Sequence, residues 1–221
     1  MATYSAIAHN FTPPTATTSA QVGAGAMTLL KTVTADDSSD VNFKDGSNDV
    51  VMDSTYRIYM FEYIEAHPAT DNVEFRFQGN ASGASGFNES MQTAIFRAQN
   101  DEGGTDTNLL YNPAGDQTNG TGKQELCENG VGNGNDESIS GNLWIFNPSD
   151  TTFQTNFMAV NNMYQKDDYS NNNFIAGYFN LTGAIDEIIF DFSSGNIQSG
   201  TFKMYGIAYW QHTKALDIIH L

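Results

Sequence analysis

The apolar residues of this 221-residue chain come in short runs whose side chains alternate between two faces, and Gly, Asn and Asp fill the gaps. A period of two is typical of β-strands, and the period of an amphipathic helix is almost missing. About ten strands at a spacing of about ten to fifteen residues favour two packed sheets over a propeller of repeated blades. We therefore predict an all-β fold, an antiparallel β-sandwich that is jelly-roll-like. The expected strands are residues 28–34, 41–43, 55–64, 73–78, 93–98, 139–146, 153–160, 174–179, 185–192 and 200–209.

The composition favours one domain with a core of its own. Hydrophobic residues make up 39% of the chain and aromatic residues 12%, which is enough apolar mass for a core without staples. We expect an extended N-terminal arm over residues 1–27, a β-sandwich domain over 28–207 and a C-terminal docking tail over 208–221. Two stretches rich in Asn, Gly and Asp, residues 99–119 and 128–137, are expected to be surface loops, where binding residues concentrate.

The charge balance excludes two classes of partner. Asp and Glu number 26 against 9 Lys and Arg, which gives a net charge of −17. Such a surface repels phosphate backbones and anionic membrane surfaces, so we expect no binding to nucleic acid. No apolar run is long enough to span a bilayer, and the first residues lack the pattern of a secretory signal. We therefore expect no membrane insertion and a product made in the cytoplasm.

No constellation of residues indicates catalysis, a metal centre or a cofactor. The four histidines are scattered and lack the spacing of a zinc site. Cys127 is the only cysteine, so no disulfide can form within one chain, and its surroundings lack the positive charge that activates a thiol. We expect it to be a buried structural residue. The sequence therefore predicts no catalytic residue, no metal ligand and no cofactor-binding residue.

Clustered carboxylates keep two alternatives open. Glu62 with Glu65, or Asp186 with Glu187, would be the acid pair if the chain were a glycoside hydrolase. Since Glu62 shares a strand face with apolar residues, we expect it to face a subunit contact or to pair with Arg76 or Arg97. The acidic clusters at 36–40 and 133–137 offer oxygen ligands to calcium, but neither fits the EF-hand pattern, which favours solvated loops.

The strand expected at residues 55–64 is apolar on both faces, which indicates a central strand. One face is expected in the sandwich core and the other against a neighbouring subunit or a covering loop. We take Tyr59, Phe61 and Tyr63, which share one of these faces, as docking candidates. The tail also carries side chains that are too apolar to remain in water, and its docking candidates are Tyr209, Trp210, Leu216, Ile218, Ile219 and Leu221.

A series of turn-and-strand motifs has the order and spacing of a known family. The motifs are STY at 54–56, YMF at 59–61, HPATDN at 67–72, FNPS at 146–149, DYS at 168–170, AGYF at 176–179, AIDEI at 184–188, SSGNI at 193–197 and SGTFKMYGI at 199–207. Over residues 29–207 the chain resembles a family of small virion proteins of tailed bacteriophages, especially aquatic ones. The resemblance implies a non-enzymatic β-sandwich on the outside of a virion, in tail fibres, tail tips or capsid decorations. It supplies no catalytic residues, and the arm and the tail depart from the family pattern.

We therefore expect a virion structural protein, displayed as a tail-fibre or tail component or as a capsid decoration and made in the host cytoplasm. Its expected partners are itself, as a homotrimer, and other virion proteins, with a host surface glycan as a further candidate. The first alternative is a carbohydrate-binding module, which would use an exposed aromatic platform. The second alternative is a glycoside hydrolase.

Overall fold

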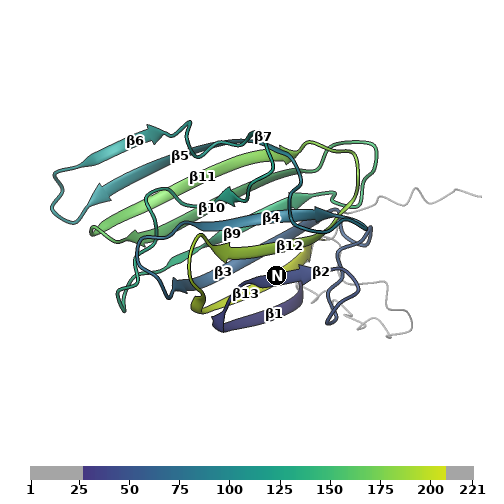
Figure 1. The fold of residues 1–221 in the computed structure, drawn as a ribbon, viewed down its shortest axis with the longest axis horizontal. Helices are drawn as coiled ribbons and strands as arrows, with labels where there is room; N and C mark the ends of the chain where they lie inside the picture. The colour runs from purple at the N-terminus through teal and green to yellow at the C-terminus, as the bar shows by residue number, and fades with distance from the viewer. Residues whose placement is uncertain (1–26, 208–221) are drawn as a thin grey trace, which may run out of the picture.

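The computed structural model describes residues 27–207, which form thirteen β-strands and no helix. Figure 1 shows two antiparallel sheets packed against each other. The large sheet has the order β1-β13-β3-β9-β10-β11-β5-β6, with β7 on β5, and the small sheet has the order β2-β12-β4-β8. The predicted all-β sandwich is confirmed. The strands are β1 (Met27–Ser38), β2 (Val41–Lys44), β3 (Ile58–Pro68), β4 (Phe75–Ala81), β5 (Met91–Asp101), β6 (Thr107–Tyr111), β7 (Thr118–Gly120), β8 (Gln124–Glu125), β9 (Ile139–Phe146), β10 (Asn156–Gln165), β11 (Tyr169–Phe179), β12 (Ile185–Phe192) and β13 (Ile197–Ile207).

The strand pairing is nested along the chain. β1 pairs with β13, β2 with β12, β3 with β9 and β4 with β8, all in antiparallel fashion. Successive pairs alternate between the large and the small sheet, as in a long hairpin that has folded over on itself. β10, β11, β5, β6 and β7 then widen the large sheet, so that one side of it extends past the small sheet (Figure 1).

The structure has more strand than the sequence predicts, and the excess lies in polar segments. Residues 99–119, expected to be a surface loop, contain β6 and β7, which pair with β5. β10 and β11 pair through Asn161, Asn162 and three consecutive asparagines at 171–173. Asn is depleted in strands, but a backbone ladder with a long neighbouring strand overrides that preference. The prediction of one continuous loop over 99–119 is therefore wrong.

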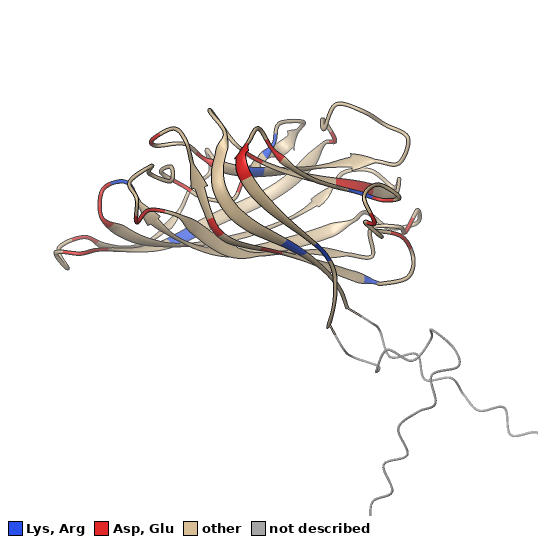
Figure 2. Cartoon of the chain, turned by 90° about the horizontal axis from the view of Figure 1, so that it is seen from below, with Lys and Arg blue, Asp and Glu red and all other residues tan. Residues whose placement is uncertain are grey.

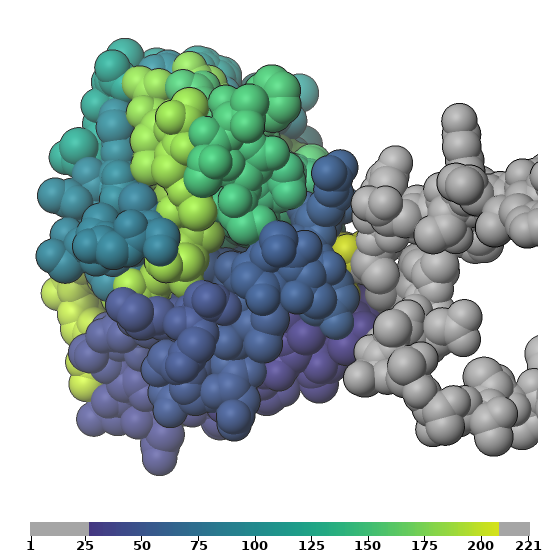
Figure 3. Space-filling model, turned by 90° about the vertical axis from the view of Figure 1, so that its right-hand side faces the viewer, coloured from purple at the N-terminus to yellow at the C-terminus, as the bar shows by residue number. Residues whose placement is uncertain are grey.

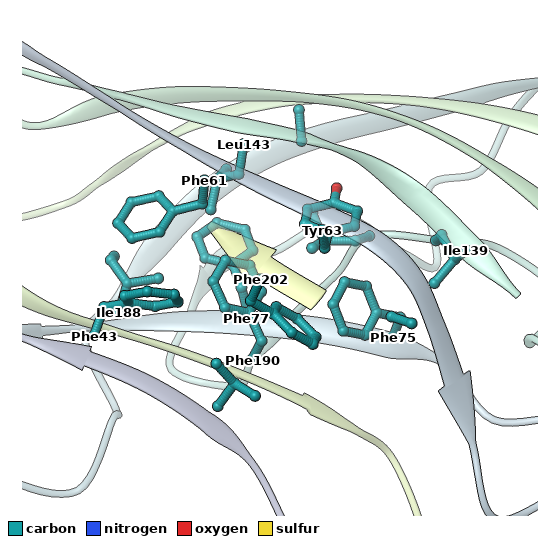
Figure 4. Packing of buried hydrophobic residues seen from close by; sticks show 14 of the residues in the cluster. Phe43, Phe61, Tyr63, Phe75, Phe77, Ile139, Leu143, Ile188, Phe190 and Phe202 are labelled. Atoms are coloured by element: carbon teal, nitrogen blue, oxygen red, sulfur yellow. The ribbon is translucent and has the colours of Figure 1, made fainter. Parts of the chain in front are cut away.

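Aromatic rings fill the space between the two sheets (Figure 4). Phe190 of β12 is completely buried, and its ring centroid lies 5.8 Å from those of Phe61, Tyr63 and Phe202 in the large sheet. Phe75 of β4 stacks on Phe190 at 5.9 Å with an interplanar angle of 10°. Rings at these separations gain attraction beyond the area that they bury, so this cluster ties the two sheets together.

The burial of β3 corrects the assignment of docking residues. Tyr59, Phe61 and Tyr63 are 0%, 1% and 0% exposed, because their side chains point at the small sheet. They belong to the core and cannot contact another molecule. The other face of this strand, with Ile58 and Met60, points away from the small sheet. The strand does have two apolar faces, as predicted. The face with Tyr59, Phe61 and Tyr63, expected to dock, lies in the core, and the face with Ile58 and Met60 points outward.

Loops close one end of the sandwich. Figure 3 shows the loop of residues 45–57, in blue, beside the loop of residues 147–155, in green. Asn147 N–H donates to the carbonyl of Arg57, which joins the two loops, and Ile185 N–H of β12 donates to the carbonyl of Pro148 at 2.8 Å. These bonds tie the two loops to each other and to the small sheet. The predicted arm, apart from Met27, and the predicted tail lie outside the described residues.

Candidate functional site

The large sheet has an outer face that the small sheet does not cover. Cross-strand register places one row of side chains straight across it, from β1 to β5. Side chains on neighbouring strands at the same register lie on the same face, so these residues form one continuous stripe. We call this stripe the central row. It consists of Leu29, Tyr205, Met60, Trp144, Met158, Ala176 and Ala94.

Two flanking rows extend the apolar surface. On one side, register aligns Val160, Phe174, Phe96 and Tyr111, and the rings of Phe96 and Phe174 stack at 4.9 Å with an interplanar angle of 8°. Large side chains on this face are open to solvent, including Leu29 at 51%, Met158 at 42%, Phe96 at 42% and Tyr111 at 60%. On the other side, the row is Ile207, Ile58, Phe146, Asn156 and Tyr178, with the exposed Asn156 between the two rings.

The outer face is nearly free of charge in a strongly acidic chain. β9, β10 and β11 contain no Lys, Arg, Asp or Glu. Many of the acidic residues lie instead in loops and turns (Figure 2). Contiguous apolar patches of this extent are uncommon on monomers and mark sites of interaction.

Glu62 and Lys203 bring charge to the outer face, and they neutralise each other. Lys203 Nζ lies 3.4 Å from Glu62 Oε2, and the Tyr205 hydroxyl donates to the same oxygen at 3.2 Å. Burial, followed by the hydrogen bond to Glu62, raises the pKa of Tyr205, so this hydroxyl keeps its proton at neutral pH. The expected pairing of Glu62 with Arg76 or Arg97 is wrong. Arg76 pairs with Asp191, and Arg97 pairs with Glu128.

A second, polar feature lies between the sheets, where the large sheet extends past the small one. A cavity of about 620 Å³ is lined by carboxylates and amides, among them Glu74, Glu125 and Glu128. Glu128 is 1% exposed and forms an ion pair with Arg97 of β5. The sequence placed Glu128 at the start of a surface loop, and its burial corrects that expectation. Burial also lowers the pKa of Arg97, since it disfavours the charged guanidinium.

Amide side chains on the inner faces of β10 and β11 hold the buried segment next to Glu128. Asn161 Nδ2 donates to the Leu126 carbonyl at 2.7 Å, and Gln165 Nε2 donates to the Asn129 carbonyl at 3.1 Å. Glu128 N–H donates to Asn173 Oδ1 at 3.2 Å. Buried backbone groups must be paired, and these amides pair them. The asparagines of these strands therefore support the fold of the cavity wall.

Glu125→Gln is expected to stabilise the protein at pH 7, by less than about 1 kcal/mol. Burial, and then the charge of Glu74, raises the pKa of Glu125, while Arg76 opposes them. A carboxyl group that ionises less readily in the folded chain costs stability above its folded pKa, and this cost disappears as the pH falls. Urea unfolding should therefore show a gain at pH 7 that shrinks at pH 4. The exposed Glu65 supplies the control, since Glu65→Gln makes the same change of side chain outside the cavity. An equal gain at both pH values would contradict the assignment.

The remaining candidates for chemistry are dispersed or engaged. Within residues 27–207 no group of three or more His, Cys, Asp or Glu side chains is arranged to hold a metal ion. Cys127 is completely buried, and burial raises the pKa of its thiol to about 12. Glu187 is 5% exposed and accepts hydrogen bonds from Asn42 and Asn80. The described residues contain no helix that is long and apolar enough to cross a membrane.

The docking candidates from the sequence do not lie on the outer face. Tyr59, Phe61 and Tyr63 are in the core. The others, Tyr209, Trp210, Leu216, Ile218, Ile219 and Leu221, lie outside the described residues. The sequence analysis did not identify the residues of the central row as a binding surface. Two features of the sequence point to them: three successive strands, β9, β10 and β11, carry no charge, and apolar residues alternate within each of them.

No family model, no curated protein and no solved structure matches this chain. Its function is therefore inferred from the surfaces and the topology described above.

Proposed function

We propose that this chain is a non-enzymatic structural protein of a tailed-phage virion, displayed on the particle exterior as a tail component or as a capsid decoration. The observation that carries the proposal is the outer face of the large sheet. It is broad, apolar and almost uncharged, which suits attachment to another protein surface.

The topology supports the same proposal. We infer that β1 to β4, β8, β9, β12 and β13 constitute a jelly roll, because their nested pairs alternate between two facing sheets. Jelly rolls are common in viral capsid proteins and in lectins. The added strands β10, β11 and β5 enlarge the outer face without changing the roll. This arrangement is consistent with the resemblance of the sequence motifs to small virion proteins.

The net charge of −17 also fits a protein displayed in many copies. A strongly negative surface keeps neighbouring copies soluble and limits nonspecific adsorption. Specific contacts must then come from a surface without that charge, and the outer face provides it. Partners would be further copies of the chain and other virion proteins.

A sugar-binding module is the second candidate, and one observation favours it. A shallow depression of about 660 Å³ on the outer face is lined by Tyr111, Phe146 and Tyr178 beside the polar Asn156. Aromatic rings next to amide groups suit the stacking and hydrogen bonding of a sugar ring. A host surface glycan would be the ligand. Binding of a glycan to the isolated protein that Tyr178→Ala abolishes would favour this candidate.

The proposed function predicts that the chain copurifies with particles. Tailed-phage particles from the lysate in which the chain is produced should be banded in a density gradient and analysed by quantitative mass spectrometry. The chain is expected in the particle band at a copy number comparable with that of other structural proteins. The control is a non-structural phage protein, which should remain in the soluble fraction. Recovery of the chain only in that soluble fraction would overturn the proposal.

A further inference from the structure

We propose that the outer face of the large sheet packs against the outer face of a second copy of the same chain, in a two-fold symmetric contact. This inference rests on the proposed function in one respect, because both assign a binding role to this face. It goes further by naming the partner, a second copy of the chain. In such a contact the same patch lies on both sides, so the patch must be complementary to itself. Two properties of the face bear on that requirement: the extent of its apolar rows and its scarcity of charge.

The size of the face approaches that of the smaller specific interfaces. Neighbouring strands lie about 4.8 Å apart and rows on one face about 7 Å apart along the strands, so each position in a row covers about 35 Å². The central row has seven residues and the flanking rows four and five. Each copy therefore offers about 550 Å². Specific interfaces bury about 600 to 1,000 Å² from each partner.

The distribution of charge points to a second copy as the occupant. Two copies that each carry −17 repel each other across any surface where their carboxylates face one another. On the outer face, Glu62 and Lys203 are paired with each other, and β9, β10 and β11 carry no charge. Asp116 lies at one edge of the face, where its carboxylate accepts a hydrogen bond from the Tyr111 hydroxyl. A basic partner would be attracted to the acidic loops instead of this face. The occupant must therefore be apolar and nearly free of charge, and the outer face of another copy has these properties.

Met158 is the position for a direct test, because it lies in the central row and is 42% exposed. Sedimentation equilibrium of the wild-type chain at about 10 µM is expected to give twice the monomer mass. Met158→Lys would place an ammonium group in the apolar contact of both copies, so we expect the dissociation constant to rise at least about 100-fold. A wild-type monomer at this concentration would overturn the proposal. So would the homotrimer expected from the sequence, because a two-fold contact between outer faces does not build one.

Val51 supplies the matched control. It is 37% exposed and lies in the loop between β2 and β3, away from the outer face. Val51→Lys adds the same charge and so lowers the electrostatic repulsion between two acidic copies by the same amount. It should leave the dimer intact. Dissociation of both variants to the same extent would contradict the proposal. Unchanged urea midpoints of the two variants would show that neither substitution unfolds the chain.

A second measurement keeps the test decisive if Met158→Lys fails to fold. Met158→Cys preserves the apolar character of the position, and the natural Cys127 is completely buried, so a maleimide reagent should label only the new thiol. Labelling of Met158→Cys is expected to slow at least about tenfold between dilute and concentrated protein, because the dimer excludes the reagent. Val51→Cys should be labelled at the same rate at every protein concentration. A concentration-independent rate at Met158→Cys would overturn the proposal.

The outcomes separate this inference from the proposed function. A chain that is present in particles but monomeric at micromolar concentration contradicts the two-fold contact alone. A stable dimer that is absent from particles supports the contact and contradicts the virion role.

Discussion

Arg97→Met is expected to lower the free energy of unfolding by about 3–5 kcal/mol, because it leaves a buried carboxylate without its partner. The side chain of Glu128 is 0% exposed and that of Arg97 is 12% exposed, so the folded chain shields this ion pair from solvent. The loss arises from the uncompensated charge of Glu128. Removing both charges should therefore restore stability, and the double variant Arg97→Met/Glu128→Gln is expected to regain more than half of the loss.

Urea unfolding at pH 7 measures these differences, and Arg76→Met is the matched control. Arg76 also pairs with a carboxylate, Asp191, but Lys123 Nζ lies 2.5 Å from the same carboxylate. Since Asp191 keeps a partner when Arg76 is removed, we expect a loss of about 1 kcal/mol or less. Equal losses for Arg97→Met and Arg76→Met would show that Glu128 does not depend on Arg97.

Phe190→Ala is expected to cost about 3–5 kcal/mol, because it opens a cavity in the middle of the aromatic cluster. Its ring contacts the rings of both sheets, among them Phe61 and Phe75, and no part of it is exposed. The midpoint of urea unfolding should fall, while the m-value, which is the slope of the free energy of unfolding against urea concentration, should stay the same.

Phe153 is the control for this prediction. It is 72% exposed in the loop before β10, and Phe153→Ala should change stability by less than about 0.5 kcal/mol. A small loss for Phe190→Ala, similar to that for Phe153→Ala, would mean that the two sheets do not depend on this cluster.

The class of fold could be predicted from the sequence because alternation is a local property. Each of the ten expected strands overlaps a strand of the structure, and the Gly and Asn residues between them mark the turns. β6 and β7 could not be found in this way. Their residues are exposed or half-buried, so no buried face imposes an apolar pattern on them. They form because β5 offers a long edge for backbone pairing.

Which face of a strand lies inside could not be read from the sequence alone. In residues 58–64 both faces are apolar, and only the position of the small sheet decides that Tyr59, Phe61 and Tyr63 are in the core. The outer face poses a related problem. Met60 and Trp144 become neighbours through register between β3 and β9, which are distant in the chain, and the hairpin of β9 and β10 adds Met158. Alternation within each strand carries no information on that register.

The buried ion pair shows a different limit. Glu128 follows an apolar segment and precedes a stretch rich in Gly and Asn, which is the composition of a surface loop. It is buried because the amides of Asn171 and Asn173 in β11 pair its backbone and Arg97 pairs its side chain. These partners lie far away in the sequence, so no local pattern indicates them.

The virion role is tested most directly by immunogold electron microscopy of intact particles, with an antibody raised against the purified protein. We expect gold particles at a fixed place on the virion. Label on the tail would make the chain a fibre or tail component, and label over the head would make it a decoration protein. An antibody against an established structural protein serves as the positive control. Particles that carry the control label but no label for this chain would contradict the account.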